Sequence, residues 1–316
     1  MSVSTLANGD ATTNATHSSA SPAHPTVTYG TAKVDGLEIF YRQAGPTDAP
    51  TLLLLHGFPS SSHMFRDLIP MLAARYHVIA PDLPGFGYSS APSTTEYTYT
   101  FEKLASVIDE FTYVMGVRSY VLYMQDYGGP VGMRLALKNP VKIRGLVVQN
   151  AVVNVEGWYP QIVEKFAPYW QDRNAETEKP IRDFLTAETT RFQYTHGASR
   201  LERVSPDAWM HDQSLLDRRG NAEIQAELLF QYADNVNQYP KWQEYLKSKK
   251  PPTLVVWGNN DPFFTIKGRD LFGELNSATE IHGFDAGHFA LETHGPEIAE
   301  IILGFLDRLP RSETFP

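Results

Sequence analysis

The sequence predicts an α/β fold in which helices flank a mostly parallel central sheet. Short, continuous apolar runs of strand length recur along the chain, and such runs are typical of strands buried on both faces. Apolar residues three or four positions apart fill most of the intervals and indicate amphipathic helices, for example over residues 65–72 and 104–111. Strand and helix therefore alternate, as they do in α/β proteins. The predicted strands cover residues 52–55, 78–80, 120–123, 146–148 and 254–257.

The amino-terminal part differs from the rest of the chain. Residues 1–25 are rich in Ser, Thr, Ala and Asn, contain no Lys or Arg and lack the apolar segment of a secretory signal, so we expect a disordered tail. From residue 26, apolar and polar residues alternate on both sides of Asp35 and Gly36, a dipeptide typical of a hairpin turn. An antiparallel ribbon is therefore expected to open the core.

A long segment interrupts the alternation of strands and helices. Between residues 155 and 246 the composition becomes aromatic and charged while the periodicity stays helical, which predicts an inserted helical cap. A strand near residues 279–281 and an amphipathic helix over residues 296–309 then complete the core. The predicted core thus comprises residues 26–154 and 247–316, and the predicted cap comprises residues 155–246.

Composition and charge exclude several classes of function. The chain of 316 residues carries 36 acidic and 27 basic residues, and its net charge of −9 repels nucleic acid and anionic membrane surfaces. Its apolar runs fall far short of the roughly 18 residues that a spanning helix needs. No cysteine is present, which excludes disulfides, thiolate nucleophiles and cysteine-bearing metal sites. We expect a cytoplasmic protein that binds neither nucleic acid nor membranes.

The most informative segment is an apolar strand that continues into Asp126, Tyr127 and a pair of glycines before a helix. Small residues at such a point permit a sharp turn between strand and helix that exposes one side chain, the geometry of a nucleophile elbow. Asp126 stands at the apex of this turn. Aspartate is also common as a helix N-cap, but an N-cap does not require the glycine pair. We therefore predict that the carboxylate of Asp126 is a nucleophile.

Two further residues complete a catalytic set. Asp261 follows the predicted strand at residues 254–257, and His288 lies in a loop near the carboxyl end. Each has an ordinary explanation alone, because Asp before Pro is a good turn residue and a single His is commonly a surface or core group. Their occurrence with Asp126 in the order nucleophile, acid, histidine favours a triad. Asn150, after the preceding strand, cannot supply an anion, so Asp261 is preferred as the acid.

With these residues the sequence resembles the aspartate-nucleophile branch of the α/β-hydrolase superfamily, which contains epoxide hydrolases and haloalkane dehalogenases. The resemblance covers nearly all of the chain after the tail, and it includes the segment HGFP at residues 56–59, directly after a predicted strand. It implies an α/β-hydrolase fold and an oxyanion hole formed by the main-chain N–H groups of Phe58 and Tyr127. Residues 82–89 resemble a structural turn of the family, and we assign them no chemistry.

The resemblance implies a two-step hydrolysis of a small, largely apolar electrophile. An aspartate with an ordinary pKa of about 3.9 is ionised at neutral pH and can attack carbon without a base. His288 then activates water to hydrolyse the ester on Asp126, while Asp261 orients the imidazole and stabilises its charge. No metal or organic cofactor is required. The expected partners are a small-molecule substrate and water, and the oligomeric state stays open, with a homodimer as one option.

The leaving group separates three hypotheses. The leading one is an epoxide hydrolase-like enzyme, which needs hydroxyl donors for the ring oxygen; by similarity to the family's cap, the candidates are Tyr232 and Tyr194. The alternative is a haloalkane dehalogenase, which that family equips with Trp and a polar residue where this chain has Tyr127 and Phe58. A non-catalytic binding protein with the same fold is the third. The cap tryptophans that could bind a halide instead are Trp158, Trp170 and Trp209.

Overall fold

A computed structural model describes Met1 and residues 25–310 of the chain, so the predicted tail at residues 1–25 lies almost entirely outside the described residues. The described part contains an eight-stranded sheet with the order β1-β2-β4-β3-β5-β6-β7-β8. The predicted α/β fold is confirmed. The strands are β1 (Thr28–Val34), β2 (Leu37–Ala44), β3 (Thr51–Leu55), β4 (His77–Pro81), β5 (Tyr120–Gln125), β6 (Ile143–Gln149), β7 (Thr253–Gly258) and β8 (Glu280–Phe284).

The sheet begins as an antiparallel ribbon and continues as a parallel sheet. β1 pairs antiparallel with β2, and β2 pairs antiparallel with β4. The turn between β1 and β2 uses Asp35 and Gly36, which both have positive φ, 49° and 77°, as the predicted hairpin requires. From β4 to β8 every pairing is parallel, so the carboxyl ends of these strands lie at one edge of the sheet.

Helices cover both faces of the sheet, because alternate side chains of each buried strand point to opposite sides. In β3, for example, Leu53 and Leu55 belong to one apolar core and Leu52 and Leu54 to the other. Helices α2 (Phe101–Val114), α3 (Gly128–Lys138) and α9 (Ile266–Leu275) pack on the first face. Helices α1 (Leu68–Leu72) and α10 (Ala290–Arg308) pack on the second.

The last helix, α10, begins earlier than the sequence pattern predicts. A helix was expected over residues 296–309, yet helical structure starts at Ala290. Pro296 lies inside this helix, and the backbone leaves helical geometry at His294, where φ is −128°. Because proline removes an N–H and crowds the preceding turn, the pattern marks the kink rather than the true start.

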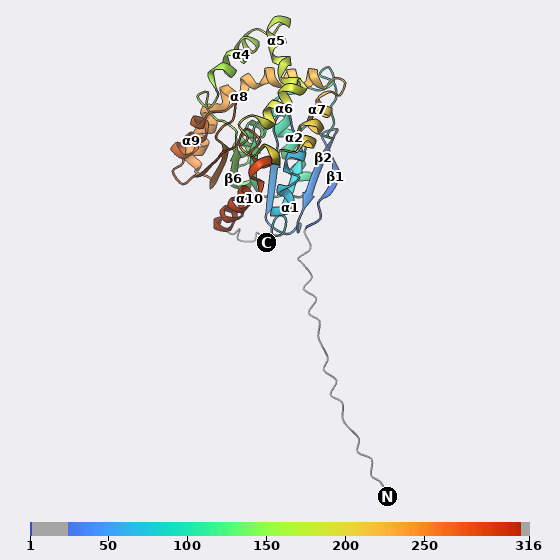
Figure 1. The fold of residues 1–316 in the computed structure, drawn as a ribbon, viewed down its shortest axis with the longest axis vertical. Helices are drawn as coiled ribbons and strands as arrows, with labels where there is room; N and C mark the ends of the chain where they lie inside the picture. Colours follow the sequence, from blue (N-terminus) through green and yellow to red (C-terminus); the bar gives the residue numbers. More distant parts are fainter. Residues whose placement is uncertain (2–24, 311–316) are drawn as a thin grey trace.

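A helical insertion lies between β6 and β7. We use this name for helices α4 to α8, which gather at the top of Figure 1, while α1 and α10 lie at the bottom. α8 continues past residue 246, where the predicted cap ends, and stops where Lys250 adopts a left-handed backbone with φ 46°. The helices are α4 (Pro160–Gln171), α5 (Ala175–Arg182), α6 (Ala187–Thr195), α7 (Pro206–Leu216) and α8 (Asn221–Lys249).

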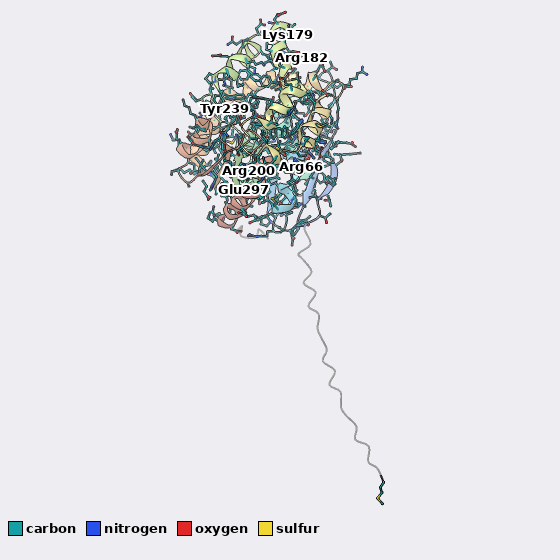
Figure 2. All side chains as sticks on the ribbon, in the orientation of Figure 1. Arg66, Lys179, Arg182, Arg200, Tyr239 and Glu297 are labelled. Carbon is teal, nitrogen blue, oxygen red and sulfur yellow. The ribbon has the colours of Figure 1, made fainter. Side chains whose placement is uncertain are left out.

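Charged contacts join the helical insertion to the core. The buried guanidinium of Arg134 on α3 donates to Asp234 Oδ2 and Asn235 Oδ1 on α8, both at 2.6 Å. Arg200, after α6, pairs with Glu297 on α10 at 2.6 Å, and the two are labelled side by side in Figure 2. No helix within residues 25–310 combines the length and the apolar character that crossing a membrane would need.

Candidate active site

Four polar side chains and the main-chain N–H of Phe58 follow the carboxyl ends of five strands that are parallel neighbours in the sheet. In open α/β sheets this edge is where ligands bind, because loops from neighbouring strands converge there. All three residues of the predicted triad lie at this edge. The residues are Phe58 after β3, Asp126 after β5, Asn150 after β6, Asp261 after β7 and His288 after β8.

Asp126 occupies a sharp turn between β5 and α3. Its φ is 47°, a left-handed conformation that Asp tolerates better than most residues. The turn presses α3 against β3, so a Cβ at Gly128 would lie 2.3 Å from the Leu55 carbonyl oxygen. A Cβ at Gly57 would likewise lie 2.3 Å from the Asp126 Cβ. Only glycine fits at these two positions, which explains why the side chain of Asp126 can reach the loop after β3.

The carboxylate of Asp126 is buried and held by main-chain donors. Its Oδ1 accepts the N–H of Phe58 at 2.7 Å, and the N–H of the next residue, Tyr127, also favours the ionised carboxylate. Its Oδ2 lies 3.9 Å from His288 Nε2. Burial raises the pKa of Asp126 to about 6, although His288 and the two N–H groups act in the opposite direction. The carboxylate is therefore mainly ionised at neutral pH.

His288 bridges the two carboxylates. Its Nδ1 lies 2.7 Å from Asp261 Oδ2, and the other Asp261 oxygen accepts the N–H groups of Phe263 and Phe264 at 2.7 and 3.1 Å. Burial alone would lower the pKa of His288, but the charge and hydrogen bond of Asp261 and the charge of Asp126 raise it above its ordinary value. The arrangement fixes the imidazole with Nε2 toward Asp126, as a general base for water would require.

Asn150 is a positioning residue that the sequence alone did not reveal. Its Nδ2 donates to Asp261 Oδ2 at 2.7 Å and to the Gly258 carbonyl at 3.2 Å, and its Oδ1 accepts the Gly258 N–H at 2.9 Å. Its main-chain oxygen accepts the Asp126 N–H at 3.3 Å. Asn150 cannot supply an anion, but its amide bonds to the predicted acid and orients it. An Asn directly after a buried strand was the available signal.

The cavity beside Asp126 and His288 is small and mainly aromatic. Both the core and the helical insertion contribute to its wall, so it lies between these two parts of the chain. A cavity of this character fits a small, apolar ligand with few polar groups. Besides Asp126 and His288, it is lined by Phe58, Tyr127, Trp158, Ile162, Phe166, Trp170, Phe184, Gln193, Leu229, Tyr232, Phe263 and Phe264.

The indole N–H groups that line this cavity already have partners. Trp158 Nε1 donates to the hydroxyl of Tyr239 at 3.0 Å, and Trp170 Nε1 donates to the Leu229 carbonyl at 2.9 Å. Trp209, the third candidate, is not among the lining residues. A halide in the cavity would therefore find neither of these two N–H groups free.

Hydroxyl and amide groups are the donors that stay available. The hydroxyl of Tyr127 and Nε2 of Gln193 are buried without a hydrogen-bond partner in the described part of the chain. Tyr232 also lines the cavity and adds a second hydroxyl to its wall. Gln193 is a second residue that sequence reasoning missed, and no sequence signal distinguished it from other polar residues of the insertion.

Tyr194, predicted as a proton donor of the cap, is not among the residues that line the cavity. Its hydroxyl bonds to Asp212 Oδ2 at 2.5 Å and to Ser60 Oγ at 3.4 Å, and its ring stacks on Phe289 with the centroids 3.9 Å apart. Asp212 is buried, and burial raises the pKa of its carboxyl to about 8. A buried carboxyl is costly without a hydrogen-bond partner, and the hydroxyl of Tyr194 supplies one. Adjacent side chains of a helix point about 100° apart. In α6 it is therefore Gln193, and not its neighbour Tyr194, that lines the cavity.

Residues 82–89, which were given no chemical role, brace the loop that carries Phe58. Asp82 accepts the N–H of Ser62 through Oδ1 at 2.7 Å and the N–H of Tyr88 through Oδ2 at 2.8 Å. His56 Nε2 accepts the Leu83 N–H at 3.0 Å, so His56 ties the two loops together rather than facing the substrate. These bonds fix the position of the Phe58 N–H.

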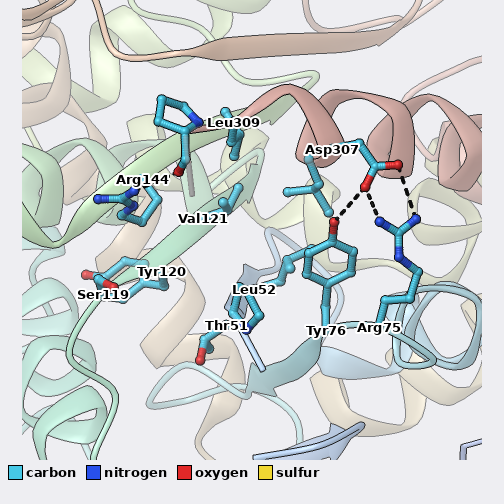
Figure 3. A pocket seen from close by; sticks show the side chains of 13 residues that line it. Thr51, Leu52, Arg75, Tyr76, Ser119, Tyr120, Val121, Arg144, Asp307 and Leu309 are labelled. Carbon is cyan, nitrogen blue, oxygen red and sulfur yellow. Dashed lines mark hydrogen bonds and ion pairs between the residues drawn. The ribbon is translucent and has the colours of Figure 1, made fainter. Parts of the chain in front are cut away.

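A larger cavity lies at the opposite edge of the sheet, beside the start of β3 and β5 (Figure 3). Its charged residues are Arg75 and Arg144, together with Asp307, which pairs with Arg75 and accepts the hydroxyl of Tyr76 at 3.3 Å. Its lining within the described residues includes no histidine and no buried carboxylate. It therefore does not compete with the site at Asp126.

The raised pKa of Asp126 predicts a stability gain for Asp126→Asn. The pKa of this carboxyl is about 6 in the folded protein and 3.8 in the unfolded chain. Ionisation therefore lowers the stability of the fold, and the whole of this loss is present above about pH 6. Asn cannot ionise, and we expect the variant to be more stable by about 1 to 3 kcal/mol at pH 8. The difference should shrink as the pH falls from 6 toward 4.

Urea unfolding at pH 8 and pH 5 measures this difference. Asp48→Asn, which changes an exposed carboxylate, is the control and should not alter the free energy of unfolding at either pH. Equal stability of Asp126→Asn and the wild type at both values would contradict the burial cost assigned to Asp126.

Comparison with known proteins identifies the family of this fold. Residues 50–295 match the family described as alpha/beta hydrolase fold. An uncharacterized hydrolase of Saccharomyces cerevisiae is 40% identical over 272 residues, which are 85% of this chain and 93% of the relative. A haloalkane dehalogenase of Mycobacterium marinum is 30% identical over 279 residues, which are 85% and 89% of the two chains.

Solved structures share the fold at lower identity. The epoxide hydrolase CorEH superimposes with a TM-score of 0.73 at 20% identity, covering 89% of this chain and 99% of its own. The haloalkane dehalogenase DbeA from Bradyrhizobium elkani gives a TM-score of 0.70 at 21% identity, covering 89% of this chain and 99% of its own. With the family match, the sequence relatives and an eight-stranded sheet of this topology, the chain belongs to the α/β-hydrolase fold family, in the branch that contains haloalkane dehalogenases.

Proposed function

We propose that this protein hydrolyses a small, largely apolar electrophile through a covalent ester on Asp126, with epoxides as the leading substrate class. The carboxylate itself is the observation that carries the proposal. Oδ1 of Asp126 is held by the Phe58 N–H at 2.7 Å, while the residue faces an aromatic cavity beside His288. A buried, ionised carboxylate with one oxygen fixed and the other toward a ligand cavity is suited to attack carbon.

In the first step Oδ2 of Asp126 attacks a ring carbon of the epoxide. The new C–O ester bond forms as the ring C–O bond breaks, and the ring oxygen leaves with the electron pair as an alkoxide. The unpaired hydroxyl of Tyr127, a residue of the cavity wall, is the proposed proton donor for that oxygen, with Tyr232 as the second hydroxyl on the wall. A proton given at this moment lowers the barrier to ring opening.

In the second step water attacks the carbonyl carbon of the Asp126 ester. His288 Nε2 takes the proton from the water, and Asp261, held by Asn150, stabilises the imidazolium that results. Negative charge develops on the former Oδ1, which accepts the Phe58 N–H at 2.7 Å, and the Tyr127 N–H serves as the second donor of the proposed oxyanion hole. The ester bond then breaks, and the departing alkoxide takes the proton from His288. The Asp126 acid that is left gives its proton back to the tyrosinate of the first step, which restores both the carboxylate and the hydroxyl.

A haloalkane dehalogenase is the second candidate. The sequence relatives of that name and the apolar cavity favour it, because a halogen on a short alkyl chain needs little polar recognition. Against it stand the indole N–H groups of Trp158 and Trp170, which are already bonded within the helical insertion and its surroundings. Halide release and diol formation in one substrate panel separate the two candidates.

Replacing the base should trap the intermediate. In His288→Gln the first step proceeds but water is not activated, so a peptide that contains Asp126 should gain the mass of one epoxide molecule. Intact-protein and peptide mass spectrometry on the variant incubated with epoxides and haloalkanes measures this. Asp126→Asn combined with His288→Gln is the control and should gain nothing. No adduct with any member of either panel would contradict both candidates and favour a non-catalytic binding protein.

Tyr127→Phe should slow ester formation from epoxides. Loss of a general acid typically costs about 100-fold or more, so we expect a decrease of roughly that size in the single-turnover rate. Tyr97→Phe is a matched control, because the Tyr97 hydroxyl is also buried and unpaired within the described residues but does not line the cavity. An unchanged rate in Tyr127→Phe, with a decrease in Tyr232→Phe instead, would transfer the proton-donor role to Tyr232.

A further inference from the structure

The side chain of Gln125 contacts the ring nitrogen on which the second step depends. Gln125 is the last residue of β5, directly before Asp126, and it is fully buried. Its Nε2 lies 2.8 Å from His288 Nε2. This is the nitrogen that must accept a proton from water, and it is the same nitrogen that lies 3.9 Å from Asp126 Oδ2. The amide of Gln125, the carboxylate of Asp126 and the water of the proposed second step therefore all approach the same ring nitrogen.

The surroundings of His288 favour its charged form. The charged groups that face the ring are Asp261 at Nδ1 and Asp126 at Nε2. The rings of Phe263, Phe264 and Phe289 pack around it with centroids 5.1 to 5.6 Å away and carry no charge. An imidazole between two carboxylates tends to hold a second proton, and an imidazolium cannot act as a base.

We propose that Gln125 is a positioning residue that donates its amide N–H to His288 Nε2 and thereby keeps this nitrogen unprotonated and in place. In this orientation a proton on Nε2 would face an N–H group, so two donors would oppose each other without an acceptor. The neutral form with its proton on Nδ1, bonded to Asp261, is then preferred. The role of Gln125 in water activation rests on the proposed function, whereas its effect on the imidazole does not.

The cost of burying Gln125 supports a role at the site. Its Oε1 is buried without a partner in the described residues, so the contact with His288 is the hydrogen bond that the side chain makes there. Oε1 lies against Gly57, where an added Cβ would approach it to 2.7 Å. A half-satisfied buried amide destabilises a fold relative to an apolar side chain of the same shape, so the contact is better explained by its effect on His288.

Titration of His288 tests the inference without any substrate. Protein labelled with nitrogen-15 in histidine is titrated by NMR, and His288→Gln identifies the His288 signals. We expect His288 in Gln125→Leu to protonate roughly one pH unit higher than in the wild type, a roughly tenfold change in proton affinity. Gln125→Met, of similar length and without an amide, should behave in the same way and serves if the leucine variant does not fold.

Gln149→Leu is the matched control. Gln149 is a buried glutamine at the end of the neighbouring strand β6, and its Nε2 donates to the main-chain oxygen of His288 at 3.3 Å rather than to the ring. Its substitution should leave the titration of the imidazole unchanged. A folded Gln125 variant in which His288 titrates as in the wild type would overturn the inference, as would an equal shift in Gln149→Leu.

Single-turnover kinetics separate this inference from the proposed function. With a substrate that forms the ester, Gln125→Leu should slow ester hydrolysis at pH 7 by up to about tenfold and ester formation by less than about threefold. Failure to trap an ester in His288→Gln would refute the proposed function and leave the titration result standing. Equal slowing of both steps with an unshifted titration would instead give Gln125 a merely structural role.

Discussion

The hydrogen bond between the Phe58 N–H and the buried carboxylate of Asp126 is the interaction on which the rest of the site depends. A buried carboxylate is costly unless main-chain donors or positive charges compensate it, and this bond at 2.7 Å supplies part of that compensation. It requires the loop after β3 to approach the turn after β5 closely, which only glycine at residue 57 permits. It also requires the left-handed backbone of Asp126 at φ 47°. The fold around the site satisfies these two conditions.

The need to hold the Phe58 N–H against the Asp126 carboxylate also accounts for neighbouring polar residues to which we assign no chemical step. His56 and Asp82 hold the loop of Phe58 through bonds to main-chain N–H groups, and Asn150 links the Asp126 turn to Asp261. Aromatic side chains of the helical insertion line the cavity beside Asp126, and burial among such side chains lowers the effective dielectric constant. This burial raises the pKa of Asp126. It would also strengthen the attraction between an oxyanion and each N–H group that donates to it. If Asp126 is the nucleophile, as we propose, the burial that makes its carboxylate reactive also lowers the stability of the fold.

Much of this arrangement could be predicted from the sequence, because strand ends in a parallel sheet meet at one edge. Asp126 and Asp261 each follow an apolar run by at most a few residues, so pattern alone brings them together with His288. Side-chain direction within the insertion could not be predicted in this way. Tyr194 and Gln193 are neighbours on α6, yet only Gln193 lines the cavity. Which face of an aromatic helix meets the core depends on packing rather than on a local pattern.

The roles of two amide side chains at the site could not be predicted from the sequence either. Asn150 and Gln125 carry no charge and match no motif, and their importance lies in what they bond to: one orients Asp261 and the other meets His288 Nε2. The start of α10 was misplaced for a local reason, since Pro296 marks a kink inside that helix. Of the three cap tryptophans that the sequence offered as halide donors, two donate instead to the hydroxyl of Tyr239 and to the main chain of Leu229, and the third does not line the cavity.

The central claim is that Asp126, and not water, makes the first bond to the substrate. One turnover in heavy-oxygen water, with the wild-type enzyme in excess over a substrate that it converts, tests this most directly. If Asp126 is the nucleophile, the product receives ordinary oxygen from the carboxylate, and the heavy oxygen appears in the peptide that contains Asp126. Heavy oxygen in the product of the first turnover, with an unlabelled Asp126 peptide, would contradict the claim.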